Sequence, residues 1–276
     1  MLNLNCKGRL LRSDQAAVMG ILNATPDSFY TQDKYSHDGA LLEKAGKMIE
    51  EGALILDIGG MSTRPRATVI SEAEETDRVL PLIEEIKKHF PQTFLSIDTY
   101  RARVASAAIQ SGADIINDIS AGDMDPEMMA TAASLQVPYI LMHMQGTPAT
   151  MQDNPVYTNV TAEVLDFFIA KTAQCREAGI LDIILDPGFG FGKTQFHNYQ
   201  LLKGLHTLRI TRLPVLAGLS RKSMVYRVLG TDADQALNGT TALHMLALQQ
   251  GAALLRAHDV REAVECVRLH TYYQTI

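Results

Sequence analysis

Cysteine is scarce in this 276-residue chain, and the cysteines that occur are isolated from one another. There are three, Cys6, Cys175 and Cys266, and they form no Cys-x-x-Cys pair. An odd set of isolated cysteines cannot build an even disulfide framework and is typical of proteins from a reducing compartment. The histidines and cysteines also lack the spacing of a zinc site.

Long apolar runs and an excess of positive charge are missing as well. Residues 1–18 contain no unbroken stretch of the roughly 7–15 apolar residues that a signal peptide requires. No segment reaches the roughly 18–20 apolar residues of a membrane span. Lys and Arg number 25 against 31 Asp and Glu, a net charge of −6, whereas nucleic acids and anionic membranes attract clustered positive charge. We therefore expect a cytoplasmic protein that binds neither nucleic acid nor membrane.

The chain does contain a regular alternation of short apolar runs and longer stretches with helical spacing. Continuous apolarity is typical of parallel strands that are buried on both faces. Eight such runs cover residues 18–22, 54–56, 94–97, 115–116, 139–142, 183–185, 215–217 and 254–255. Helical periodicity is clear over residues 73–90, 160–178 and 236–250. Ser71 and Glu74 give the first of these helices a capping signature.

This alternation predicts an α/β fold with a parallel sheet. The 276 residues are close to the roughly 250 that are typical of a (β/α)₈ TIM barrel. Hydrophobic residues make up 46%, enough for a sizeable core, and no linker-like segment divides the chain. We predict one barrel domain spanning residues 1–276. An open doubly wound sheet is the alternative, which eight units disfavour.

Polar side chains follow seven of the eight runs, at the point where each predicted strand ends. They are Asn23, Asp57, Asp98, Asn117 with Asp118, His143, Asp186, and Arg256 with His258. One such residue is usually a turn former or helix cap. In a barrel, however, the carboxyl ends of all strands converge on the face that carries active sites. The mixture of acids, amides and bases predicts a polar ligand with an anionic part.

The residue types suggest which part of such a ligand each side chain would contact. Asp98 and Asp186 suit paired N–H donors on a planar heterocycle. Arg64, Arg256 and His258 suit a phosphate-type group. Asn23 offers an oxygen to Mg²⁺, which prefers oxygen ligands and substrate phosphates.

The segment 188–194 (GFGFGKT) ends like a phosphate-binding Walker loop. That motif needs a glycine five positions before its Gly-Lys pair, where this chain has Pro187. We therefore interpret the segment as a loop over the barrel mouth.

Together these motifs resemble those of the dihydropteroate synthase family. The matching segments run in the family's order through nearly the whole chain: 19–29 (MGILNATPDSF), 57–65 (DIGGMSTRP), 97–99, 116–119, 141–146, 186–193, 220–223 and 256–260. The resemblance implies a homodimeric TIM-barrel transferase that is a target of sulfonamides. It implies that 6-hydroxymethyl-7,8-dihydropterin pyrophosphate and p-aminobenzoate condense to 7,8-dihydropteroate and pyrophosphate, with Mg²⁺-assisted loss of pyrophosphate preceding attack by the arylamine.

The same resemblance implies roles for individual residues. The pterin would be bound by Asp98, Asn117, Met142, Asp186, Phe191, Lys222 and Arg256. The p-aminobenzoate pocket would be bordered by Phe29, Thr63, Pro65 and Ser220. Pyrophosphate would be held by Thr63, Arg64, Arg256 and His258, with Asn23 as the ligand of Mg²⁺. The catalytic set would be Asn23, Arg64, Lys222, Arg256 and His258.

Two segments depart from the family pattern. Thr31 occupies the usual position of an aspartate, with Asp33 nearby; Met61 replaces a glutamate, and Arg66 a glycine. These changes fall in the loops that close over p-aminobenzoate, so they leave open a pterin-binding paralogue without synthase activity. A second alternative is a barrel that transfers a methyl group from methyltetrahydrofolate to a corrinoid protein, which would share the pterin-binding carboxylates and amide but has no reason to keep segments 63–65 and 220–222. The role of His143, structural or substrate-binding, is also open.

Overall fold

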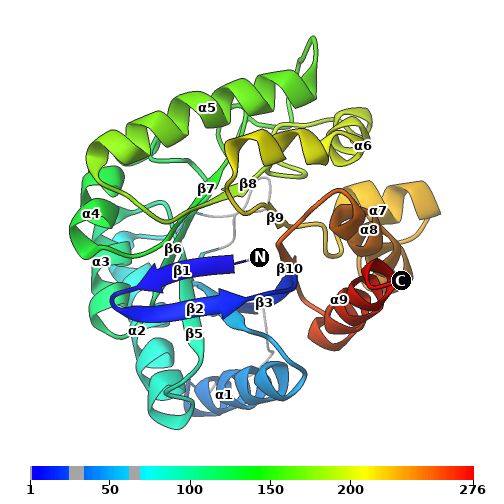
Figure 1. Cartoon of the computed structure of the whole chain (residues 1–276). Coiled ribbons are helices and arrows are strands. Elements are labelled where there is room, and N and C mark those ends of the chain that lie inside the picture. Colours follow the sequence, from blue (N-terminus) through cyan, green and yellow to red (C-terminus); the bar gives the residue numbers. More distant parts are fainter. Residues whose placement is uncertain (1, 25–33, 62–68) are drawn as a thin grey trace.

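Eight parallel strands form the barrel in a computed structural model that describes residues 2–24, 34–61 and 69–276, with side chains from residue 39 onward in the second range. The hydrogen-bonded order is β8-β7-β6-β5-β4-β3-β10-β9, and a parallel bridge between Leu185 and Val215 joins the two ends of this order. The strands are β3 (Ala17–Asn23), β4 (Ile55–Gly59), β5 (Phe94–Asp98), β6 (Ile115–Asp118), β7 (Tyr139–Met142), β8 (Ile183–Asp186), β9 (Leu216–Ala217) and β10 (Leu254–Ala257). The prediction of a TIM barrel is confirmed (Figure 1).

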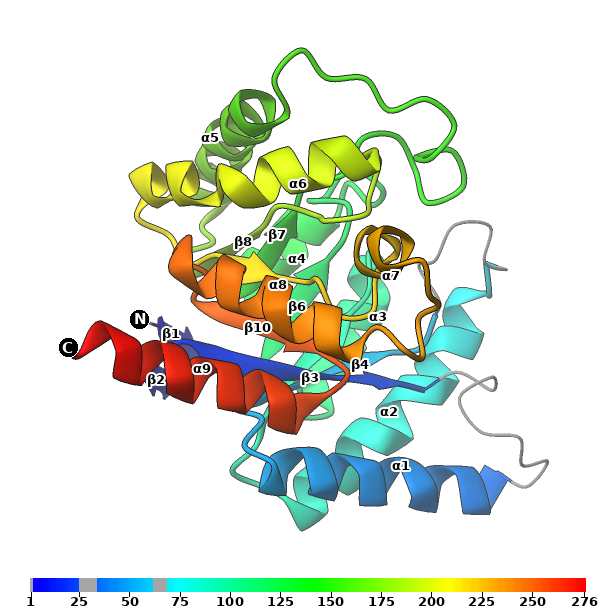
Figure 2. The ribbon, with the colours of Figure 1, turned by 90° about the vertical axis from the view of Figure 1, so that its right-hand side faces the viewer.

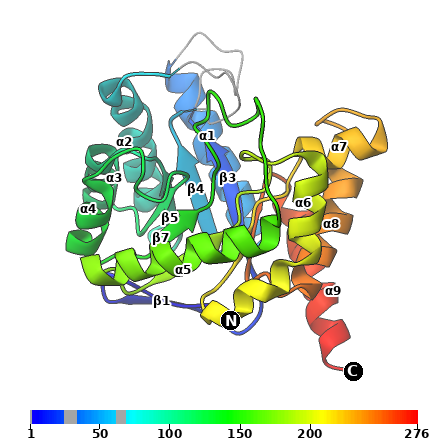
Figure 3. The same cartoon turned by 90° about the horizontal axis from the view of Figure 1, so that it is seen from above.

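Helices surround the strands on the outside (Figure 3). They are α1 (Lys34–Glu50), α2 (Glu72–His89), α3 (Ala102–Gln110), α4 (Met128–Leu135), α5 (Val160–Ala178), α6 (Gln195–Lys203), the 3₁₀ helix η2 (Leu205–Thr211), α7 (Ser223–Leu229), α8 (Leu237–Gln249) and α9 (Val260–Gln274). The three helices predicted from periodicity correspond to α2, α5 and α8. The Ser71 hydroxyl accepts the Glu74 N–H at 3.1 Å and so caps α2 as its sequence predicts.

The strands are continuously apolar because both of their faces are buried. Outward-facing side chains such as Leu56 and Ile97 pack against the helices. Inward-facing side chains such as Met19, Ile55 and Ile184 fill the barrel interior toward the N-terminal ends of the strands. This double burial is the reason that a run without polar alternation identifies a parallel strand.

An antiparallel hairpin, β1 (Leu2–Cys6) and β2 (Arg9–Ser13), lies across the N-terminal end of the barrel, and we did not predict it (Figure 2). Its alternate residues Leu2, Leu4 and Cys6 are buried against the inward-facing strand residues. The hairpin therefore closes this end of the barrel. Figures 2 and 3 show both ends of the chain on this same side.

The three cysteines are buried and unpaired. Among the helices of the described ranges, none is both long and apolar enough for a transmembrane span.

Candidate active site

Strand register brings the predicted polar side chains into one row at the C-terminal mouth of the barrel. Asn23 pairs with Gly59, Gly59 with Asp98, and Asp98 with Asn117 across three adjacent strand pairs. Farther around the barrel, Met142 pairs with Asp186. The convergence expected from the strand ends is therefore present.

Arg256, near the end of β10, joins two carboxylates: Asp98, which belongs to this row, and Asp57, which lies two residues before Gly59 on β4. Its Nε donates to Asp57 Oδ2 at 2.6 Å and its terminal NH2 to Asp98 Oδ2 at 2.7 Å. Asn117 Nδ2 also donates to Asp57 Oδ2, at 3.0 Å. Burial by itself lowers the pKa of Arg256, but the two carboxylates hold it above its ordinary value, so the guanidinium stays charged. We did not assign Asp57 to the site, although it belonged to the ring of polar strand ends.

One positive charge thus faces two carboxylates, and the carboxylates are not saturated. Asp57 Oδ1 and Asp98 Oδ1 are buried, and neither has a hydrogen-bond partner among the described residues. Burial raises the pKa of Asp98, and Arg256 offsets only part of the rise. Buried acceptors without donors are costly to leave unsatisfied. This group of Asp57, Asp98 and Arg256, which forms one wall of the mouth, is therefore suited to a ligand that carries N–H donors.

A second charged pair, Asp186 and Lys222, forms another part of the mouth. Asp186 Oδ1 accepts the Gly188 N–H at 2.8 Å. Lys222 Nζ donates to the Phe189 carbonyl and lies 4.8 Å from the centre of the Phe191 ring. Burial raises the pKa of Asp186 and lowers that of Lys222 to about 8, while their mutual attraction opposes both shifts.

Gly218 keeps open the space beside this pair. A Cβ atom at Gly218 would lie 3.6 Å from Lys222 Nζ and 3.9 Å from Asp186 Oδ2. A larger side chain here would lie against both charged groups, whereas glycine leaves room for a flat ligand.

Ser220 and His258 meet at a third part of the mouth. Ser220 Oγ contacts the His258 backbone N at 3.1 Å and the ring Nδ1 at 3.0 Å. Burial, and next the Arg256 cation, lower the pKa of His258 to about 4. The imidazole is therefore neutral near pH 7 and offers a hydrogen bond rather than a positive charge to a ligand.

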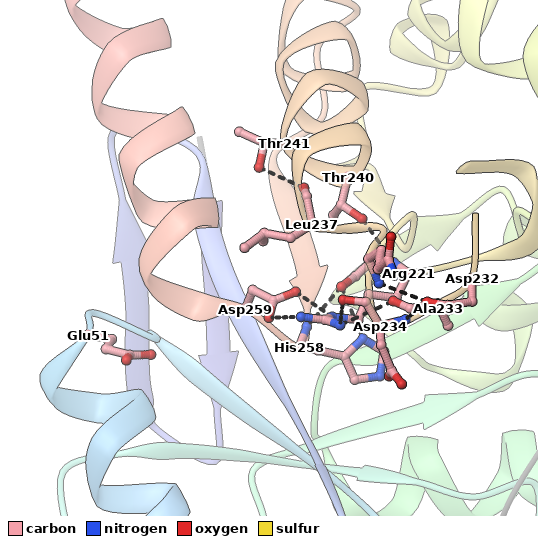
Figure 4. Close-up of polar contacts among 12 residues, drawn as sticks. Glu51, Arg221, Asp232, Ala233, Asp234, Leu237, Thr240, Thr241, His258 and Asp259 are labelled. Carbon is pink, nitrogen blue, oxygen red and sulfur yellow. Dashed lines mark hydrogen bonds and ion pairs between the residues drawn. The ribbon is translucent and has the colours of Figure 1, made fainter. Parts of the chain in front are cut away.

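Arg221 braces the loop between Ser220 and Lys222 (Figure 4). Its backbone is left-handed, with φ of 54°. The guanidinium makes two bonds to Asp259, at 2.8 and 2.7 Å, and donates to the carbonyls of Ala233 and Asp234. Its N–H donates to Thr240 Oγ1 at 3.1 Å. These bonds join three loops next to the site, a role that we did not predict for Arg221.

Several predicted site residues lie outside the described residues: Phe29, Thr63, Arg64 and Pro65, together with Thr31, Asp33 and Arg66 of the altered segments. Met61, the remaining altered position, is buried. The Tyr100 hydroxyl approaches its sulfur at 3.8 Å. A hydrophobic thioether thus fills a position beside α2 that needs no charged partner.

The Walker-like segment does not present its lysine to the barrel mouth. Lys193 points inward and its ammonium contacts His143 and backbone carbonyls. This geometry agrees with the interpretation of the segment as a loop and gives His143 a structural partner. His244, which we did not assign to the site, is buried in α8.

The chain matches the model of a family described as pterin binding enzymes over residues 19–258. It is 46% identical over 254 residues to the dihydropteroate synthase of Haemophilus influenzae, with 91% of this chain and 92% of the relative covered. The Escherichia coli K12 enzyme is 43% identical over 272 residues, covering 97% and 95%. The chain belongs to the dihydropteroate synthase family.

Solved structures of dihydropteroate synthases have the same fold. The Xanthomonas albilineans enzyme with 4-aminobenzoic acid superposes with a TM-score of 0.93 at 41% identity, covering 99% of this chain and 98% of that one. A Yersinia pestis dihydropteroate synthase in a sulfonamide drug complex gives 0.93 at 41%, with both chains covered completely. The X. albilineans enzyme in complex with 7,8-dihydropteroate gives 0.90 at 38%, also over 100% of both.

Proposed function

We propose that this chain catalyses the reaction of the dihydropteroate synthases, in which 6-hydroxymethyl-7,8-dihydropterin pyrophosphate and p-aminobenzoate give 7,8-dihydropteroate and pyrophosphate. The observation that carries the proposal is the presence of two carboxylate–cation walls at one barrel mouth, with Asp98 beside Arg256 and Asp186 beside Lys222. Asp98 also keeps a buried oxygen without a partner among the described residues. A flat heterocycle with donors on its edges and an anionic tail complements both walls.

Pterin recognition would use both walls. Asp186 accepts from the 2-amino and N3 groups of the ring, and Lys222 donates to a ring acceptor. Asp98 and Asn117 contact the opposite edge. Met142 and Phe191 pack beside the ring faces. This division places the buried carboxylate oxygens against ligand N–H groups, which removes the cost of leaving them unpaired.

Arg256 lies between the pterin walls and the pyrophosphate. The C–O bond to pyrophosphate breaks first, and its electron pair leaves with the pyrophosphate. Arg64 and Arg256 stabilise the growing negative charge, while His258, neutral near pH 7, donates a hydrogen bond. The amine of p-aminobenzoate then forms the new C–N bond and loses a proton. Phe29, Thr63, Pro65 and Ser220 would border its pocket, and no protein nucleophile is needed.

The residues at the end of β3 fit a magnesium ion. A Cβ atom at Gly59 would lie 3.6 Å from Asn23 Oδ1 and 3.7 Å from Asp98 Oδ2, so two oxygens border this one glycine. Among the described residues, no group of three or more His, Cys, Asp and Glu could hold a metal by itself. Magnesium commonly binds one or two protein oxygens and completes its shell with water and substrate phosphate. Asn23 would therefore hold Mg²⁺ together with pyrophosphate, and the ion would supply charge stabilisation to the leaving group.

We also infer a homodimer in the cytoplasm. Exposed apolar side chains on α7, α8 and α9 support an interface: Val228, Leu229, Leu246 and Leu269. Buried, unpaired cysteines are compatible with a reducing compartment. Sedimentation should give a dimer for the unchanged chain and a monomer for Leu229→Asp with Leu269→Asp. If the protein without substitutions sediments as a monomer at micromolar concentration, the inference of a homodimer is contradicted.

The test of the function uses purified protein, dihydropterin pyrophosphate, p-aminobenzoate and Mg²⁺. We expect pyrophosphate release that depends on p-aminobenzoate and is matched by dihydropteroate formation. Pterin binding without release would favour a silent paralogue. Methyl transfer from methyltetrahydrofolate to a corrinoid protein would favour the methyltransferase alternative.

A further inference from the structure

Lys193 carries a buried ammonium group that the proposed function does not use. The side chain is 2% exposed. Its Nζ lies 2.9 Å from His143 Nδ1, 3.3 Å from the His143 carbonyl, and 3.0 Å from each of the carbonyls of Gly188 and Phe191. Four acceptors from two loops thus share one cation.

These acceptors would repel one another without the cation. Burial lowers the pKa of His143 to about 3, so its ring is neutral and Nδ1 can accept from Lys193. The three carbonyl oxygens direct their negative dipole ends toward the same point. None of these four hydrogen-bond partners is a carboxylate. Burial lowers the pKa of Lys193 to about 7, and the charge of the nearby Asp186 opposes this shift. The Lys193 amine donates to all four acceptors, and one of them, the Gly188 carbonyl, also accepts the Phe191 N–H.

The cluster lies directly behind the pterin wall. The Gly188 N–H donates to Asp186, and the Phe191 N–H returns to the Gly188 carbonyl at 3.0 Å. Between them, the Phe189 carbonyl accepts from Lys222. The backbone of the turn 188–191 therefore contacts Asp186 and Lys222, while Lys193 binds its Gly188 and Phe191 carbonyls and Gln152 Nε2 binds its Gly190 carbonyl.

The turn also lies in close backbone contact with the loop after β7. A Cβ atom at Gly188, where φ is 67°, would lie 1.9 Å from the His143 carbonyl oxygen. At Gly192 it would lie 2.4 Å from the Gln145 carbonyl oxygen. Only glycine permits this approach, and Lys193 bonds both loops at the point where they meet.

We propose that Lys193 is a positioning residue, whose ammonium ties the turn 188–191 to the loop after β7 and thereby holds Asp186, Phe191 and Lys222 in place for the pterin. This inference rests on the proposed function. Lys193 does not touch the pterin; it acts through the backbone of the turn. Loss of the ammonium should therefore weaken pterin binding selectively, with little effect on the p-aminobenzoate pocket.

The test compares Lys193→Met with Lys87→Met. Both variants make the same Lys→Met change at a largely buried side chain. Lys87, however, lies at the closed end of the barrel, where it contacts Asp114 and the Thr93 carbonyl. Pterin binding is measured by calorimetry with dihydropterin pyrophosphate and Mg²⁺, without p-aminobenzoate. Removing buried hydrogen bonds to a cation should raise the Kd of Lys193→Met by roughly tenfold to a hundredfold.

The expected pattern separates positioning from general loss of structure. Lys87→Met should lower the Tm and leave the pterin Kd within about twofold of the unchanged value, because the sites are far apart. In Lys193→Met, the KM for p-aminobenzoate at saturating pterin should stay within about twofold. An unchanged pterin Kd in Lys193→Met, or an equal rise in Lys87→Met, would overturn the proposal.

His143→Leu serves if Lys193→Met does not fold. It removes only the imidazole acceptor and should raise the pterin Kd by about threefold to tenfold; an unchanged Kd would contradict the proposal. Failure of the unchanged chain to bind pterin would refute the proposed function. Tight binding that neither variant weakens would refute the positioning role alone.

Discussion

At the closed end of the barrel, Asp114 is fully paired. Its Oδ1 accepts from Arg9 at 3.0 Å, and its Oδ2 accepts from Lys87 at 2.7 Å and from the Leu95 N–H at 2.9 Å. At the open end, Asp57 and Asp98 share Arg256, and each keeps a buried oxygen without a partner among the described residues. Both ends place carboxylates beside cations, but only Asp114, at the closed end, has partners for both of its oxygens.

The difference separates stability from binding. The paired charges of Asp114, Arg9 and Lys87 are partly buried and link β2 of the hairpin to the barrel, and neither oxygen of Asp114 lacks a donor. Unsaturated charges cost stability and are retained where a ligand completes their hydrogen bonds. The two ends cannot be distinguished by their charged residues alone. They differ in the number of hydrogen-bond donors that contact each carboxylate.

The largest expected effect is at the open end, in Asp186→Asn. The change replaces one of the two acceptor oxygens by an NH2 group, which is a donor and would face a ligand N–H group. The pterin Kd should rise by about 100-fold, because hydrogen bonds to charged groups are the strong ones. The Tm should not fall, because burial already disfavours the charged form of Asp186. Calorimetry and thermal unfolding measure the two quantities, and near-normal pterin affinity would remove Asp186 from the recognition wall.

Asp114→Asn should give the reverse pattern. The free energy of unfolding should fall by about 2 kcal/mol, since two cations lose a charged partner in a partly exposed setting. The value of kcat/KM for both substrates should stay within about twofold. Urea unfolding and steady-state kinetics measure the two. A large loss of activity in a folded protein would break the distinction between the two ends.

The pH dependence of pterin binding should report Lys222. The pKa of Lys222 is lowered from its ordinary value to about 8, so its charge is present below that pH and is lost above it. Affinity should weaken above pH 8 by up to roughly tenfold per pH unit. Lys222→Met should bind more weakly throughout and lose this part of the dependence. Identical slopes in both proteins would contradict the assignment.

The smallest expected effect concerns His258. Because its pKa is lowered to about 4, its ring should not titrate between pH 5.5 and pH 8 in the unliganded protein. Proton NMR of the ring C–H, assigned with His258→Gln, measures this directly. A midpoint near the ordinary value of about 6.5 would mean that His258 offers a positive charge to the pyrophosphate.

The strands could be predicted because parallel strands leave a strong local signal, and the ring of polar strand ends followed from the barrel itself. Which members of that ring contact one another could not be predicted. Asp57 and Arg256 are 199 positions apart, and their contact depends on the closure of the barrel between β3 and β10. The Arg221–Asp259 brace joins residues 38 positions apart, and the Lys193–His143 contact joins residues 50 positions apart, so neither leaves a local signal in the sequence.

The hairpin was missed although its alternation is visible. Leu2, Leu4 and Cys6 alternate with exposed residues, but a strand of five residues carries little weight without the surface that it covers. That surface is formed by the starts of strands from all along the chain.

Both chain ends lie beside the hairpin, away from the mouth (Figures 2 and 3). A tag or tether attached at either end should therefore leave the opening accessible to small molecules. Immobilised protein on a sensor surface should show the same affinity for pterins whichever end anchors it.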